Sequence, residues 1–121
     1  MKHISEKRWT MLIKIDFDNP VFQRELVPDI RPADLEGFYL SASDSDKSNL
    51  FFVLLNSAHH YESSGDNDLA AHLSFLIAYY LFTVLTPPGS AELALHYIKK
   101  AISLNHLAEY DQWLALIEKG N

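Results

Sequence analysis

The feature of this sequence that most constrains its fold is a stretch of 17 residues without a formal charge, Leu69–Leu85, which reads LAAHLSFLIAYYLFTVL. A membrane-spanning helix needs about 20 predominantly apolar residues and usually has basic residues on one flank. Here residues 65–68 (GDND) precede the stretch and residues 87–89 (PPG) follow it, with no Lys or Arg near either end. We therefore expect a central helix that is buried on all sides within a globular domain, and no membrane partner.

Helical patterns occupy the chain from Ser48 onward. Four helices are predicted, over residues 48–63, 68–85, 90–104 and 107–119. Their candidate N-terminal caps are Asp66 or Asn67 for the second helix, Ser90 for the third and Asn105 for the fourth. Gly65 is suited to end the first helix in a left-handed conformation, and the prolines of segment 87–89 break the chain after the second helix. Because the connections are short, we expect successive helices to be antiparallel neighbours.

The first 47 residues follow a different pattern. Apolar and polar residues alternate along Thr10–Asp18, which is typical of a half-buried strand. A short helix is predicted over residues 19–27, with Pro20 in its first turn, and a second over residues 32–36, before Gly37.

These patterns predict one domain, residues 1–121, with an irregular N-terminal part (1–47) and a four-helix part (48–121). The expected fold class is mainly α: an antiparallel helical bundle with a short strand-plus-helix extension at the N-terminus. With 121 residues, of which 48% are hydrophobic, the chain is large enough to bury a sizeable core.

Two sets of residues in the helical part share the spacing of a known helix-hairpin repeat. The sets are Leu54, Ala58, Tyr61, Gly65 and Ala70, and Gly89, Ala94, Ile98 and Ala101. In both sets small residues stand where two helices cross closely, and large residues fill the groove beside them. The pattern resembles the tetratricopeptide (TPR) hairpin over about residues 50–106, which implies TPR-like hairpins that share a central helix. Phe82 and His106 depart from the family's pattern, and the two glycines are 24 residues apart rather than the roughly 34 of a tandem array.

Composition excludes several classes of function. A formal net charge of −6 gives the chain no general affinity for phosphate backbones, so we expect no nucleic-acid partner. The absence of cysteine excludes disulfides, iron–sulfur clusters and a thiolate nucleophile. No phosphate loop or dinucleotide motif is present, so no cofactor is expected. The N-terminus lacks an apolar run of secretory length, which favours a cytoplasmic protein.

The distribution of charge gives the main functional hint. Residues 48–98 contain no Lys or Arg. A negative patch is therefore predicted from Asp44, Asp46, Glu62, Asp66 and Asp68. Such a patch steers partners of opposite charge, although the same charges would also serve solubility alone. The hypothesis is a non-enzymatic protein-binding module, most concretely an immunity protein or antitoxin, or a secretion chaperone, that masks a basic partner.

Aromatic residues of the central helix offer a second candidate surface. If the neighbouring helices do not cover the whole of this helix, an exposed strip with Tyr79 and Tyr80 would form a groove for the partner. If they do cover it, both tyrosines belong to the core.

The alternative function is a small hydrolase or metal-binding enzyme that uses His59, His60 and Glu62. His72 and His96 lie on two further predicted helices. The spacing does not favour a metal site, because adjacent histidines point about 100° apart on a helix and no His-Glu-x-x-His motif is present. Glu62 shares a helix face with His59 only. We expect these histidines to be bystanders, with no catalytic residue and no metal ligand among them.

Overall fold

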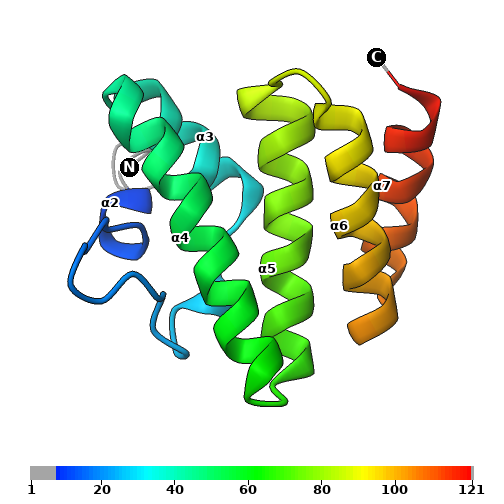
Figure 1. Ribbon diagram of the computed structural model, residues 1–121, viewed down its shortest axis with the longest axis horizontal. Coiled ribbons are helices and arrows are strands. Elements are labelled where there is room, and N and C mark those ends of the chain that lie inside the picture. Colours follow the sequence, from blue (N-terminus) through cyan, green and yellow to red (C-terminus); the bar gives the residue numbers. More distant parts are fainter. Residues whose placement is uncertain (1–7, 121) are drawn as a thin grey trace.

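The computed structural model describes residues 8–120 and places the helices side by side around a central one (Figure 1). The elements are α2 (Trp9–Leu12), η1 (Val27–Asp29), α3 (Pro32–Ser41), α4 (Asp44–Ser63), α5 (Asn67–Tyr79), η2 (Tyr80–Leu85), α6 (Ser90–Leu104) and α7 (Ala108–Lys119). Helix α5 lies between α4 and α6, while α2, α3 and α7 lie behind these three (Figure 1). The mainly helical, bundle-like class predicted from the sequence is confirmed.

Helix α5 is the core of the molecule, as its lack of charge predicts. Ten consecutive residues, Leu73–Phe82, are all buried, although they point in every direction around the helix axis. The helix Asn67–Leu85 is long and apolar enough to cross a membrane, and 67% of its most apolar window is buried inside the protein. Its last part, η2, is π-helical and ends at Thr86, whose φ of 46° is left-handed.

The four helices predicted after residue 47 are all present; Asp66 is the N-cap residue of α5 as predicted, but other caps differ from expectation. Helix α4 begins at Asp44, because the Ser43 hydroxyl accepts the backbone N–H of Asp46 at 3.2 Å. Gly65 has a φ of +81°, the left-handed conformation expected at a helix end. The predicted capping serine of α6, Ser90, lies inside that helix, and α7 begins after Leu107 rather than after an Asn105 cap.

The strand predicted over Thr10–Asp18 is wrong. The first residues of this segment belong to α2, residues 13–16 have no regular structure, and residues 8–120 contain no strand with which they could pair. A single extended segment has no ladder of hydrogen bonds to stabilise it. The alternation instead reflects one-sided packing, since Ile13 is buried and Ile15 is partly buried against the helices.

The helix predicted over residues 19–27 is also wrong, because side chains of α4 bind the backbone groups that it would have used. The Ser57 hydroxyl accepts the N–H of Phe22 at 2.9 Å, and the Tyr61 hydroxyl donates to the carbonyl of Phe22 at 2.5 Å. The Asn56 side chain donates to the carbonyl of Pro20 at 3.0 Å. These contacts hold the segment as irregular backbone along α4.

The second predicted short helix exists as α3 but continues past Gly37 to Ser41. Gly37 does not end this helix. Its lack of a side chain instead allows the indole of Trp9 to approach the helix closely. A Cβ atom at this position would lie 2.4 Å from Cδ1 of Trp9. The indole of Trp9 packs on this glycine and meets the ring of Phe38 edge-on, with ring centroids 5.6 Å apart. Residues 1–7, on which the prediction of no signal peptide rests, lie outside the described residues.

Candidate functional site

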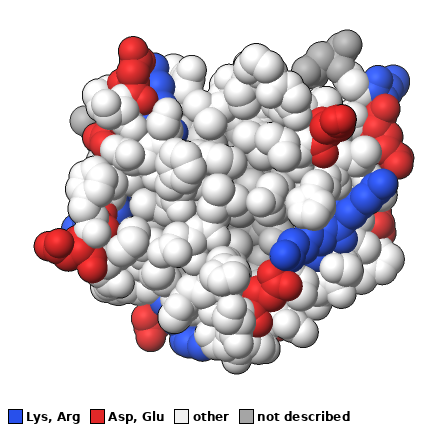
Figure 2. All heavy atoms as spheres, viewed as in Figure 1, with Lys and Arg blue, Asp and Glu red and all other residues white. Residues whose placement is uncertain are grey.

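The five acids predicted to form one patch lie in two separate groups. Asp44 and Asp46 are in the first turn of α4, whereas Glu62 is in its last turn and Asp66 and Asp68 follow it. A 20-residue helix is about 30 Å long, so the two groups stand at opposite ends of the molecule. In Figure 2 the acidic residues accordingly appear as separate spots around the margin. The prediction of one continuous patch is corrected.

Three of these acids are also paired with cations. Asp44 lies 3.6 Å from the ammonium of Lys47, and Glu62 lies 2.8 Å from that of Lys100. Asp66 pairs with Arg24, and this hydrogen bond raises the pKa of the guanidinium. Arg24 of the N-terminal part therefore pairs with an acid of residues 48–98, a segment that contains no Lys or Arg of its own.

Tyr79 and Tyr80 are buried, so they cannot form the exposed strip for which they were candidates. The Tyr79 hydroxyl donates to the carboxylate of Glu36, and the Tyr80 hydroxyl donates to the carbonyl of Lys47 at 2.6 Å. Burial raises the pKa of Tyr80 well above its ordinary value. The alternative, that both belong to the core, is the correct one.

The histidines do not converge. His60 and His96 are exposed and each meets the adjacent tyrosine ring edge-on. The Nε2 atom of His72 lies 2.8 Å from the carbonyl oxygen of Ile30, and burial lowers the pKa of this ring. Residues 8–120 contain no group of three His, Cys, Asp or Glu side chains that could hold a metal ion.

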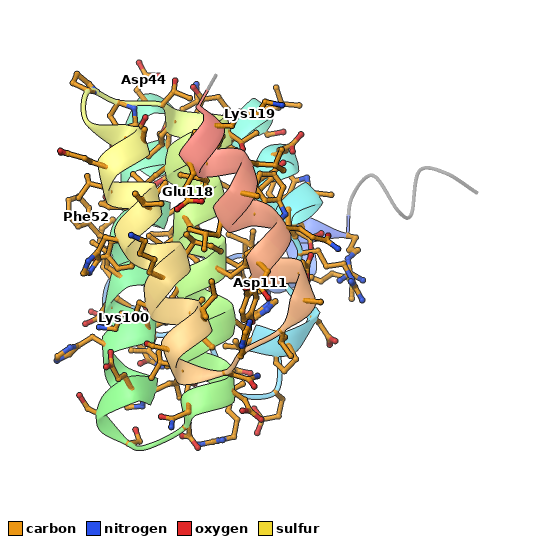
Figure 3. All side chains as sticks on the ribbon, turned by 90° about the vertical axis from the view of Figure 1, so that its right-hand side faces the viewer. Asp44, Phe52, Lys100, Asp111, Glu118 and Lys119 are labelled. Carbon is orange, nitrogen blue, oxygen red and sulfur yellow. The ribbon has the colours of Figure 1, made fainter. Side chains whose placement is uncertain are left out.

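The structure instead reveals an uncharged face formed by α4, α5 and α6. Figure 2 shows its centre free of Lys, Arg, Asp and Glu; charged groups surround this centre, and Lys atoms beside acidic ones reach inward at the lower right. In Figure 3, turned by 90°, Phe52 and Lys100 project from the same side of the bundle. We call this the α4–α6 face. Its residues used below are Phe52, Leu55 and His59 of α4, Ser74 of α5 and Tyr97 of α6.

Where α4 meets residues 15–20, two exposed phenylalanines line a shallow cavity of about 210 Å³. Phe52 is 62% exposed and Phe17 is 76% exposed. Asp16 also lines this cavity. Large apolar side chains gathered at one place on a surface mark interaction sites more often than single exposed ones do. The sequence pattern does not predict this surface, because a run without Lys and Arg does not indicate which of its uncharged residues remain exposed.

A second cavity, of about 110 Å³, lies between α4 and α6 with α5 as its floor. Its lining residues are Leu55, Ala58, His59, Glu62, Ser74, Tyr97 and Lys100. The ion pair of Glu62 and Lys100 joins the two flanking helices here. Ser74 is 1% exposed, and its hydroxyl has no hydrogen-bond partner. By helical spacing, Ala71 and Ala78 share the face of α5 with Ser74, which leaves room above it.

Comparisons of the chain with protein-family models, with curated proteins and with solved structures found no match.

Proposed function

We propose that the chain is a non-enzymatic protein-binding module whose partner docks on the α4–α6 face. The observation that carries this proposal is a surface whose centre holds no charged residue, with Phe52 of α4 exposed on it, on a chain whose net charge is −6. Depletion of charge and enrichment of aromatic residues are typical of the core of a protein interface, and charged groups are typical of its rim. The α4–α6 face has this arrangement.

The acids at the two ends of α4 give the partner its expected character. A chain with an excess of negative charge attracts a basic protein over distances of about one Debye length, roughly 8–10 Å. An immunity protein or antitoxin that masks a basic toxin therefore remains our most concrete form of the proposal, with a secretion chaperone as the second. The acids would steer the partner from the rim, and the uncharged face would supply the contact. A cytoplasmic location is part of the same proposal.

We also propose that the helices form TPR-like hairpins. This is supported by the burial of the small residues at the resembling positions, since Ala70, Ala94 and Ala101 have no exposed surface. Small buried residues at these positions allow α5 and α6 to approach closely.

The experiment that tests the binding module is site-specific photocrosslinking. A benzophenone amino acid placed at Phe52 is expected to crosslink one protein in cells that express the chain. The same group at Leu116, an exposed apolar residue of α7, is the matched control. The crosslinked protein is then purified, and its affinity for the chain is measured directly. Phe52→Asp is expected to weaken this binding at least tenfold, and Leu116→Asp is expected to leave it unchanged. Equal effects of the two substitutions would place the interface elsewhere.

The alternative, a small hydrolase that uses His59, His60 and Glu62, is supported by one observation: His59 and Glu62 line the same cavity as Ser74. An activated serine normally donates a hydrogen bond to its general base. The Ser74 hydroxyl makes no such bond, and His60 does not line the cavity. For this reason we prefer the binding module.

A further inference from the structure

We infer that the cavity between α4 and residues 15–20 receives one apolar side chain of the partner, from a segment in which Lys or Arg residues flank that side chain. This inference rests on the proposed function, because it states which group of the basic partner anchors at the exposed phenylalanines. Its basis is an apolar lining that is open to solvent, a wall that is held in shape by hydrogen bonds, and acids that no described cation pairs with.

The lining of the cavity is mostly apolar. Five of the seven residues that line it are apolar, namely Ile15, Phe17, Pro20, Phe52 and Val53. In the described part of the chain, the ring of Phe52 meets Phe51 edge-on, and no ring contact joins it to Phe17. The space of about 210 Å³ is several times the roughly 30 Å³ that one water occupies, so it has room for an apolar side chain. Such a guest removes exposed ring surface from water, which favours binding.

The wall opposite α4 is fixed by hydrogen bonds. The Oδ1 atom of Asp16 accepts the backbone N–H groups of Asp18 and Asn19, at 3.0 and 3.3 Å. The Asn56 side chain of α4 donates to the carbonyl of Pro20 at 3.0 Å, which ties the end of this wall to the helix. A site that is formed before binding loses less conformational entropy when the partner docks. The cavity can therefore accept a side chain without rearrangement of its own backbone.

The charges beside the cavity are negative. Asp16 lines the cavity, and Asp18 follows the exposed Phe17 directly. Within residues 8–120 neither acid forms an ion pair with a cation. Lys14 does not line this cavity, and α4 contains no Lys or Arg after Lys47. Opposite charges favour association, so the residues next to the inserted side chain should be Lys or Arg.

The test uses three short peptides as probes for the partner's segment. They are acetyl-Lys-Lys-Leu-Lys-Lys-amide, its counterpart with Ala in place of Leu, and acetyl-Glu-Glu-Leu-Glu-Glu-amide. Binding is followed at equal ionic strength through the backbone amide NMR signals of the full chain. The basic Leu peptide is expected to shift signals around Phe17, Asn49 and Phe52 in a saturable manner. The other two should bind at least fivefold more weakly, because one lacks the large apolar group and the other lacks positive charge.

A first pair of variants tests the apolar lining. Phe17→Ala is expected to weaken binding of the basic Leu peptide about fivefold, because it removes apolar surface that the guest would cover. Leu116→Ala, which removes an exposed apolar side chain of α7, is the matched control and should leave binding unchanged. Both residues are exposed, so neither change should unfold the protein.

A second pair of variants separates local charge from net charge. The double variant Asp16→Asn, Asp18→Asn removes two charges and keeps an oxygen at position 16 for the hydrogen bonds of the wall. It should weaken binding of the basic Leu peptide about threefold and flatten the dependence on salt. The double variant Glu109→Gln, Glu118→Gln removes two charges from α7 and should have a clearly smaller effect.

Equal binding of the Leu and Ala peptides, or no saturable shift with either, would overturn the inference, as would equal effects of the two double variants. Self-association of the free chain that Phe17→Ala abolishes would place a second copy in the cavity and would also overturn it. The crosslinking experiment at Phe52 decides the proposed function independently. A captured partner together with peptides that do not bind would leave the binding module in place and remove only this anchor.

Discussion

At the scale of single residues, His72 links the central helix to the segment before α3. Its ring lies 2.8 Å from the carbonyl oxygen of Ile30, and burial lowers its pKa below the ordinary value of 6.5 although this contact opposes the shift. The ring is therefore neutral near pH 7, with Nε2–H donating to the carbonyl. A histidine that is neutral when folded and protonates more readily when unfolded couples folding to pH.

The free energy of unfolding should consequently fall as the pH drops below about 6.5, because His72 then binds a proton in the unfolded chain but stays neutral in the folded chain. Above this pH the contribution of His72 is constant. In His72→Gln, which keeps a side-chain N–H donor, this part of the slope should disappear. Urea unfolding of both proteins at several pH values between 5 and 8 measures the difference. Parallel curves for the two proteins would show that His72 does not contribute.

The other histidines of the helical part lead to a prediction about metal. His59, His60 and His96 stand apart from His72, and the described residues contain no preorganised ligand set. Binding of a metal to the folded state alone would stabilise the protein by mass action. We expect the melting temperature to be unchanged by equimolar zinc. A stabilisation that a chelator reverses would instead favour the metal-binding alternative.

At the scale of elements, the helices are held together by small residues at close approaches. Gly37 of α3 lies against the indole of Trp9 in α2, and Ala94 of α6 is completely buried where α6 packs on α5. Each position admits no larger side chain without movement of its neighbour. These two contacts fix α3 to the N-terminal part and α6 to the central helix, and they can be tested separately.

Gly37→Ala should lower the stability of the wild type, because the added methyl group displaces Trp9 at a cost of about 1–3 kcal/mol. In a Trp9→Ala background the clash is gone, and the higher helix propensity of alanine should raise stability by up to about 1 kcal/mol. Thermal or urea unfolding of the four proteins of this cycle measures both effects. The same sign of change in the two backgrounds would argue against the Trp9 contact.

Ala94→Leu should overpack the crossing of α5 and α6 and cost about 1–3 kcal/mol. Ala91 of the same helix is exposed, so Ala91→Leu is the matched control and should change stability little. Both variants are compared by urea unfolding. An unchanged stability for Ala94→Leu would mean that the two helices do not meet at this residue.

At the scale of the whole molecule, the five acids predicted to form a patch are separated from the proposed contact surface. The acids lie at the two ends of α4, and the α4–α6 face between them carries the exposed aromatic residue. Charges on the rim of an interface mainly set the association rate and its dependence on salt, while buried contacts mainly set the dissociation rate. The two kinds of residue should therefore affect different rate constants.

Charge reversal at Asp66 and Asp68 should slow association with the basic partner found by crosslinking and should flatten its salt dependence. Charge reversal at Asp44 and Asp46, at the other end of α4, should have a similar effect. Phe52→Asp should mainly accelerate dissociation. Association and dissociation kinetics at two ionic strengths measure all three variants. An effect confined to one acidic pair would indicate that the partner sits at that end of the helix.

The sequence by itself determined those features that depend on residues close to one another along the chain. The uncharged stretch at 69–85 predicted the buried central helix. Gly65, Pro87 and Pro88 predicted where helices end, because periodicity and backbone conformation are local properties. The helix at 19–27 was predicted wrongly, since distant side chains of α4, Ser57 and Tyr61, bind the backbone of Phe22. The strand at Thr10–Asp18 was predicted wrongly, since residues 8–120 contain no strand with which it could pair.

The candidate site was decided only by the tertiary structure. In the sequence Glu62 belongs to the run without Lys or Arg and Asp44 lies just before it, yet a helix of 20 residues holds the two acids at opposite ends. Lys100 and Ser74 are far from Glu62 along the chain, but the packing of α4 and α6 against α5 brings all three to one cavity. Which side chain remains exposed and which hydroxyl remains unpaired depends on how the helices cover one another, and no local pattern of residues encodes that coverage.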